Sequence, residues 1–210
     1  MRISPVPCPS DPDWRRFDPR GMAAAARTSG SEGTSLTSVG VASVRAMRKT
    51  HRMALGDELA ALFHRDLTRL AQQLPAFTNQ DAIWQCAPGI TNSAGNLILH
   101  LEGNLREYVG RLLGGFPYRR ARDEEFAADG IPVVELAARI DHVRRLVPSV
   151  VRQLSDAQMQ ATFPEDPLGS PLSTRQFLIH LLGHLNYHLG QIDYLRRVLT
   201  RGNAVQYAQM

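Results

Sequence analysis

The residues in this sequence best suited to chemistry are histidines spaced four apart. His180, His184 and His188 follow one another in the segment FLIHLLGHLNYHLGQIDYLRRVL. On a helix with about 100° per residue, His188 falls about 40° from His184, and both lie in or beside a stripe of leucines. Side chains four residues apart on a helix are neighbours, so the imidazoles of His184 and His188 can bind one metal ion.

A third histidine, His100, lies in the segment NSAGNLILHLEGNLREYVGRLL. It falls at the edge of that segment's apolar face, where it can reach a neighbouring helix. Three neutral imidazoles suit zinc, nickel, cobalt or iron(II), and the type of ligand does not choose among them. A di-iron site would need Glu-x-x-His motifs, which this sequence lacks. We therefore expect one divalent metal ion, held by His100, His184 and His188. Zinc or nickel is expected first, with iron or manganese as alternatives.

A purely structural role for these histidines is the alternative to a metal site. Imidazoles in an apolar face cost free energy unless each ring nitrogen has a partner. A metal ion satisfies one nitrogen and a supporting acceptor satisfies the other. The same histidines can instead be core residues that bond within the fold. That alternative predicts no bound metal and no loss of stability on chelation.

The pattern of apolar residues and breakers predicts four helices and no strand, hence an all-α four-helix bundle. Thr91 or Asn92 is expected to cap the second helix and Ser173 the fourth. About seventeen residues link the second and third helices, which allows a long crossover. Its charged stretch, residues 119–131, can either cover the site or be solvated, and we expect it to be solvated. The predicted helices span residues 53–74, 92–114, 132–154 and 173–200.

Composition indicates one globular domain, preceded by an N-terminal segment of different composition. Of the chain's 210 residues, we assign 51–205 to the bundle. Residues 1–50 are rich in Pro, Gly, Ser and Thr, so we expect them to be disordered. The alternative is a spurious upstream extension of the reading frame, because a single lysine, Lys49, among so many arginines suggests GC-rich coding DNA.

Charge and cysteine content exclude several classes of function. The net charge of +4 arises wholly from the first fifty residues, so the neutral bundle offers no basic surface for nucleic acid. No apolar run is long enough for a membrane span. With only Cys8 and Cys86, we expect no disulfide framework and a cytoplasmic location.

Two motifs resemble those of the DinB/YfiT-like superfamily. One is Gly95-Asn96-Leu97, followed by His100-Leu101 and Gly103-Asn104-Leu105-Arg106; the other is His184 followed by His188-Leu189-Gly190-Gln191. The resemblance covers residues of about 50–200. It implies a divalent-metal site at His100, His184 and His188, a long crossover after the second helix, and frequent homodimers. Characterised members include S-transferases and isomerases that use a low-molecular-weight thiol.

The expected function is that of a metal-dependent enzyme acting on a small-molecule substrate. It would transfer a low-molecular-weight thiol to an electrophilic substrate, or act as a metal-assisted hydrolase. Asn104 and Gln191 are candidates for orienting the substrate or a water molecule near the metal. His180 is a candidate proton carrier, with a supporting or surface role as the alternative. The alternative is a non-catalytic, metal-binding stress-response bundle. Arg196 and Arg197 are expected to be surface charges near the end of the fourth helix.

Overall fold

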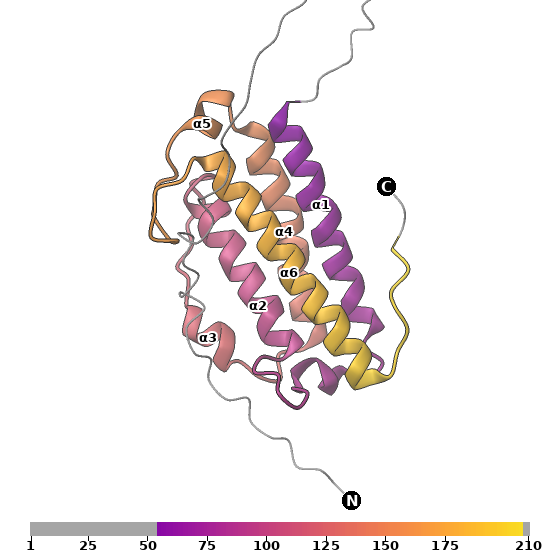
Figure 1. Cartoon of the computed structure of the whole chain (residues 1–210). Coiled ribbons are helices and arrows are strands. Elements are labelled where there is room, and N and C mark those ends of the chain that lie inside the picture. The colour runs from indigo at the N-terminus through magenta and orange to yellow at the C-terminus, as the bar shows by residue number, and fades with distance from the viewer. Residues whose placement is uncertain (1–53, 208–210) are drawn as a thin grey trace, which may run out of the picture. The chain divides into compact units, whose positions relative to one another are not determined.

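The computed structural model describes residues 54–207, and these confirm the all-α four-helix bundle (Figure 1). No strand forms within that part of the chain; it contains a single isolated bridge, between Thr162 and Ser173. Two short helices accompany the four long ones. In chain order the helices are α1 (Leu55–Gln73), α2 (Ala94–Leu105), α3 (Arg122–Ala127), α4 (Val133–Gln153), α5 (Asp156–Gln160) and α6 (Thr174–Thr200).

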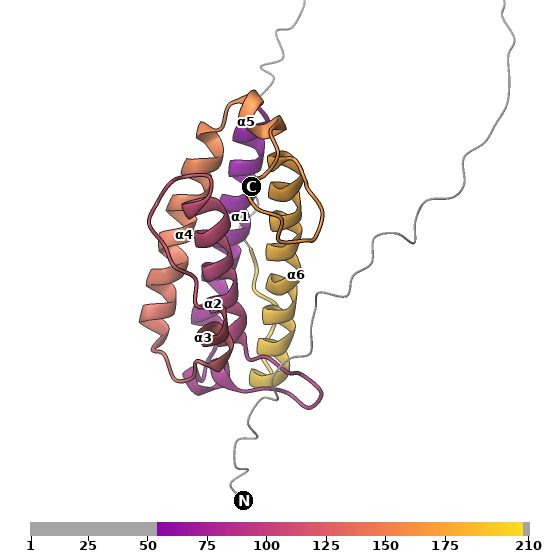
Figure 2. The same ribbon diagram turned by 90° about the vertical axis from the view of Figure 1, so that its left-hand side faces the viewer.

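The four long helices run side by side (Figures 1 and 2), and their buried apolar side chains form one core. α1 packs on α4 and α6, and α2 packs on the same two helices. Side chains such as Phe63, Ile98 and Leu185 lie in the shared core with no exposed surface. α2 and α6 run antiparallel, because His100 meets His184 while Tyr108, two turns later, meets Phe177. Residues four apart on α2 therefore face residues about four apart on α6, in reverse order.

The observed helix ends lie within two residues of the predicted ones, except at the C-terminal end of α2. Ser173 caps α6 as predicted: its hydroxyl accepts a bond from the Gln176 backbone amide. The cap of α2 is Ser93 rather than Thr91 or Asn92, since Ser93 forms a reciprocal capping box with Asn96. A capping box needs an amide or carboxyl side chain three residues after the cap. Of Thr91, Asn92 and Ser93, only Ser93 has such a residue at that position.

α2 does not continue to residue 114 as a uniform helix. It changes at Leu105 to a π-helical turn, Arg106–Arg111, which carries Tyr108. Turns of this kind are rare and often lie at functional sites. Two 3₁₀ turns, Leu74–Ala76 and Gln80–Trp84, connect α1 to α2.

A second buried polar cluster, called the Arg196 cluster below, lies where α6 ends. The expectation of a surface position is wrong for Arg196, whose exposed fraction is 1%. Its guanidinium donates to Gln73 Oε1 at 2.7 Å and to Asp193 Oδ1 at 2.9 Å. It also donates to the backbone oxygen of Asn203 at 2.9 Å, and Gln73 in turn bonds the Tyr207 hydroxyl. The cluster thus joins α1, α6 and the segment that follows α6.

Several expectations about the ends of the chain lie outside the described residues. They include the disorder of residues 1–50 and the alternative of a spurious extension, so the domain limits stay predictions. Cys8, one of the two cysteines behind the expectation of no disulfide framework, also lies outside the described residues, so that expectation stays a prediction. Within residues 54–207, no helix is long and apolar enough to cross a membrane.

Candidate metal centre

His100, His184 and His188 come together between α2 and α6, with one ring nitrogen of each within 4.8 Å of the others. His184 Nε2 lies 3.2 Å from His100 Nε2 and 3.0 Å from His188 Nε2. Two nitrogens bound to one tetrahedral zinc ion lie about 3.3 Å apart, given Zn–N bonds of about 2.0–2.1 Å. The spacing of the three nitrogens therefore fits a single ion.

The outer nitrogens of two of these rings have acceptors. His188 Nδ1 lies 2.6 Å from Gln191 Oε1, and His100 Nδ1 lies 3.1 Å from Glu125 Oε2. An amide oxygen or a carboxylate only accepts, so each Nδ1 carries the proton and each Nε2 keeps a lone pair. Both lone pairs are directed toward the point that the three histidines share. This is the tautomer that ligation through Nε2 requires.

The surroundings keep the three rings neutral near pH 7. Burial lowers the pKa of His184 to about 2, with contributions from the neighbouring His188 and His100. Burial also lowers the pKa of His188, to about 4, and it lowers the pKa of His100. A neutral imidazole can donate its lone pair to a metal ion, whereas a protonated one cannot.

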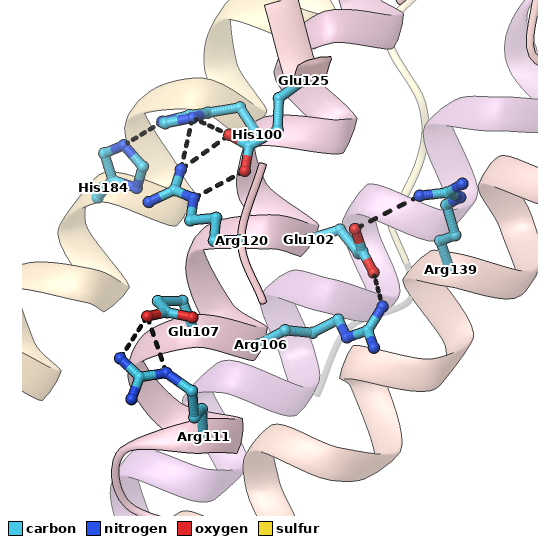
Figure 3. A network of polar contacts seen from close by, with 9 residues as sticks. All are labelled: His100, Glu102, Arg106, Glu107, Arg111, Arg120, Glu125, Arg139 and His184. Atoms are coloured by element: carbon cyan, nitrogen blue, oxygen red, sulfur yellow. Dashed lines mark hydrogen bonds and ion pairs between the residues drawn. The ribbon is translucent and has the colours of Figure 1, made fainter. Parts of the chain in front are cut away.

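Glu125 and Arg120 reach the metal centre from the segment between α2 and α4 (Figure 3). Arg120 donates through Nε to Glu125 Oε1 at 2.7 Å and through Nη2 to Glu125 Oε2 at 2.8 Å. Burial opposes ionisation of Glu125, but the bonds from Arg120 and His100 outweigh it and lower the pKa of the carboxyl. Arg120 Nη2 also lies 3.1 Å from His100 Nδ1, and since both groups carry hydrogen, the carboxylate is the partner they share.

The expectation that residues 119–131 are solvated holds for Arg119, Asp123, Glu124 and Asp129, which are exposed, but it is wrong for Glu125. The stretch contains α3, and Glu125 is only 7% exposed. Asn96 on α2 holds the C-terminal end of α3, since its side-chain amide contacts the backbone oxygens of Glu125, Phe126 and Ala128 at 2.9–3.2 Å. Asn96 is thus both part of the cap of α2 and the anchor of the segment that supplies Glu125.

The sequence drew attention to neither Glu125 nor Arg120 as a site residue. Both lie in the charged run RRARDEEF, where several carboxylates and arginines look alike. The one signal was indirect: the motif residue Asn96 is polar within an otherwise apolar helix start. A buried amide of that kind needs several backbone partners, and here they are the carbonyls of α3.

The three candidates for roles beyond ligation lie at different depths. His180 is exposed and stacks between Phe177 and His184, with ring centroids at 5.9 and 6.4 Å. Gln191 is exposed and accepts from His188, so it supports a ligand. Asn104 is 8% exposed, one turn beyond His100 on α2, and its Oδ1 has no hydrogen-bond partner among the described residues.

Other acidic residues of α2 and its π-helical turn belong to separate contacts (Figure 3). Glu102 is paired with Arg106 at 2.9 Å and approaches Arg139 of α4 at 3.8 Å. Glu107 bonds Arg111 one turn later. Neither carboxylate belongs to the group of histidines that can hold a metal ion.

The fold and the site together define a class of protein: an all-α bundle with three convergent histidines. The family model of the DinB superfamily matches residues 62–192. This chain therefore belongs to the DinB superfamily, as its motifs predicted.

Two solved structures share the fold. A DinB-like protein from Bacillus subtilis is similar with a TM-score of 0.54 and 14% sequence identity, over 72% of this chain and 98% of the other. A DinB-like protein from Bacillus cereus gives a TM-score of 0.53 and 16% identity, over 68% and 90% of the two chains. No curated protein matches this sequence.

Proposed function

We propose that this chain is a metal-dependent enzyme of the DinB-like type, with one divalent ion bound by His100, His184 and His188. The observation that carries the proposal is the convergence of three neutral imidazoles, 3.0 and 3.2 Å apart at Nε2, at a partly buried position. Hydrogen bonds confined to the protein do not account for this arrangement. The Nε2 atoms of His100 and His188 both present lone pairs to His184 Nε2, which carries at most one hydrogen.

The number of donors favours catalysis over a purely structural ion. Among the described residues, the group that can hold a metal contains three histidines and no fourth Cys, Asp or Glu. Structural zinc sites use four protein ligands, whereas catalytic sites use three and leave a position for water or substrate. A divalent metal with such an open position lowers the pKa of a water or thiol that binds it, so that an anionic nucleophile forms near neutral pH.

The residues around the centre have separate tasks in this proposal. Glu125 and Gln191 hold His100 and His188 in the tautomers that ligate. Asn104 has a buried amide oxygen without a partner on the side of α2 that carries His100, and we assign it to orient a hydrogen-bond donor of the substrate. His180 is exposed beside His184, and burial of part of its ring lowers its pKa, so it can accept a proton near neutral pH.

Two related reactions are proposed for the site, and they differ in the nucleophile. The nucleophile is either a low-molecular-weight thiol, transferred to an electrophilic small molecule, or water, which makes the protein a hydrolase. The resemblance to thiol-dependent members of the superfamily favours the thiol. A cytoplasmic location, a homodimer and the absence of nucleic-acid or membrane partners stay predictions.

The proposal is tested by measuring bound metal in protein purified without a histidine tag or chelator. We expect about one equivalent of zinc, nickel, iron or manganese by elemental mass spectrometry. His184→Ala and His188→Ala should each lose it. His180→Ala is the matched control, because it removes an imidazole from the same face of α6 without removing a ligand, and it should keep the metal.

Two results would count against the proposal. One is wild-type protein that binds none of these ions even after incubation with each. The other is a loss of metal in His180→Ala as large as in His184→Ala. If the metal is present, a screen of electrophiles with and without a low-molecular-weight thiol separates transfer from hydrolysis. Turnover that needs the thiol supports transfer, and turnover without it supports hydrolysis.

A further inference from the structure

We propose that Glu125 is a positioning residue for the metal centre, and that Gly103 is the residue that makes room for it. The inference rests on the proposed metal site and assigns a role that three histidines alone do not require. Glu125 holds the Nδ1 proton of His100, so that His100 presents Nε2 to the ion. Arg120 donates to both oxygens of that carboxylate and so fixes its orientation.

Burial and hydrogen bonds restrict the position of the Glu125 carboxylate. Glu125 is 7% exposed, and both of its oxygens bond Arg120, whose side chain is itself only 12% exposed. One of those oxygens also accepts from His100 Nδ1 at 3.1 Å. An acceptor held on two sides in this way sets the direction of the imidazole ring. A carboxylate behind a metal-bound histidine fixes the tautomer and also makes the ligand nitrogen more basic.

Gly103 is the second, independent part of the argument. A Cβ atom at position 103 would lie 2.1 Å from Glu125 Oε1 and 2.9 Å from its Cδ. The backbone conformation does not call for glycine here, since the residue has a negative φ within α2. Glycine in a helix interior costs about 1 kcal/mol relative to alanine. Glycine at position 103 therefore lowers the stability of α2 at the point where the Glu125 carboxylate comes closest to the helix.

The spacing on α2 agrees with this role. His100 and Gly103 are three residues apart, so they lie on adjacent parts of one helix face. The carboxylate passes over Gly103 and meets His100 one turn earlier on α2. The rival explanation is that Glu125 only neutralises Arg120. It predicts that the ion pair stabilises the fold but that the metal affinity does not depend on it.

The test is a titration of the apoprotein with cobalt(II), whose visible absorption spectrum reports the geometry of its ligands. Glu125→Gln keeps the shape of the side chain and removes the charge. Gly103→Ala leaves Glu125 and every ligand in the sequence but displaces the carboxylate, which lies at the end of a flexible side chain. We expect each variant to bind cobalt about 10–100-fold more weakly, with an altered spectrum.

Two controls separate positioning from general damage. Gly183→Ala adds a methyl group to α6 at a glycine with open space around it, and it should leave the affinity unchanged. Glu135→Gln removes a carboxylate of the exposed pair with Arg139 and should also have no effect. Thermal unfolding followed by circular dichroism checks that every variant folds.

A double-mutant comparison makes the test specific. Once Glu125→Ala has removed the carboxylate, Gly103→Ala has nothing to displace, so the double variant should bind cobalt as Glu125→Ala does. Wild-type affinity and spectrum in both Glu125→Gln and Gly103→Ala would overturn the inference while leaving the metal site in place. Additive losses in the double variant would overturn the link between the two residues. A wild-type protein without cobalt binding would overturn the proposed function itself.

Discussion

Two groups of buried polar side chains lie along α6, one in its middle and one at its C-terminal end. In the middle, His184 and His188 meet His100 of α2, and the nitrogens that face inward present lone pairs to one another. At the end, Arg196 donates to Gln73, to Asp193 and to a backbone oxygen. Both groups cost free energy to bury. The donors of Arg196 have acceptors within the chain, whereas only the outer nitrogens of His100 and His188 have such partners and their inward-facing nitrogens do not.

The difference separates a ligand site from a structural contact. A guanidinium has only donors, and at Arg196 each acceptor nearby is an oxygen of the protein. In the histidine cluster, two acceptors face a third nitrogen that carries at most one hydrogen, which suits a cation better than any arrangement of the histidines' own hydrogens. Replacement of Arg196 and removal of the metal ion test whether the two clusters differ in this way.

The largest effect is expected at the Arg196 cluster. Arg196→Met should lower the free energy of unfolding by about 3–5 kcal/mol, because Asp193, Gln73 and the Asn203 carbonyl lose a buried donor. Urea unfolding of the metal-free protein measures this change. The bound metal per folded chain should stay as in the wild type. Loss of metal in Arg196→Met would mean that the two clusters are coupled.

A smaller stabilisation is expected from the metal ion itself. At free metal one hundred times the dissociation constant, the folded state should gain about 2.7 kcal/mol, since the ion binds the folded chain in preference to the unfolded one. A chelator should remove this gain and nothing else. The gain should be the same in Arg196→Met, because the clusters share no partner. No shift of the unfolding curve with metal would contradict an ion bound at the histidines.

The smallest effect is expected where Asp66 joins α1 to α6. Asp66 has no exposed surface, and it accepts from Arg65 and from Asn186 at 2.8 Å each. Its burial opposes ionisation, but the hydrogen bonds from these two residues prevail and lower the pKa of the carboxyl. Asp66→Asn should cost about 2 kcal/mol at neutral pH, as expected for charge-assisted bonds to partly exposed partners.

The pH dependence of that contact has a defined sign. The folded-state pKa lies below the unfolded value of about 3.9, so the folded state releases its proton more readily. The contribution of Asp66 is complete above that pH and is lost as the pH falls through the folded-state pKa. Urea unfolding between pH 2 and 5 should show a steeper loss of stability in wild type than in Asp66→Asn. Equal slopes would mean that the carboxylate is not stabilised by folding.

The fold was largely predictable because its determinants are local. Apolar residues at helical spacing, interrupted by Pro and Gly, predicted all four long helices, and the ends to within two residues except at the C-terminal end of α2. The capping residue of α6 was predicted correctly, whereas that of α2 was placed one or two residues early. The π-helical turn at Arg106–Arg111 was not predicted, since periodicity does not distinguish a π turn from an α turn over six residues.

The sequence by itself determined which histidines can meet. Four-residue spacing aligns His184 and His188 on one helix, and an edge position on its own helix lets His100 reach them. Only the tertiary structure decided what supports them. Glu125 and Arg196 look like other charged residues in their local sequence, yet one lies behind a ligand and the other in the core. The contact of Glu125 with His100 spans 25 residues and that of Arg196 with Gln73 spans 123, and no helical period carries information over such separations.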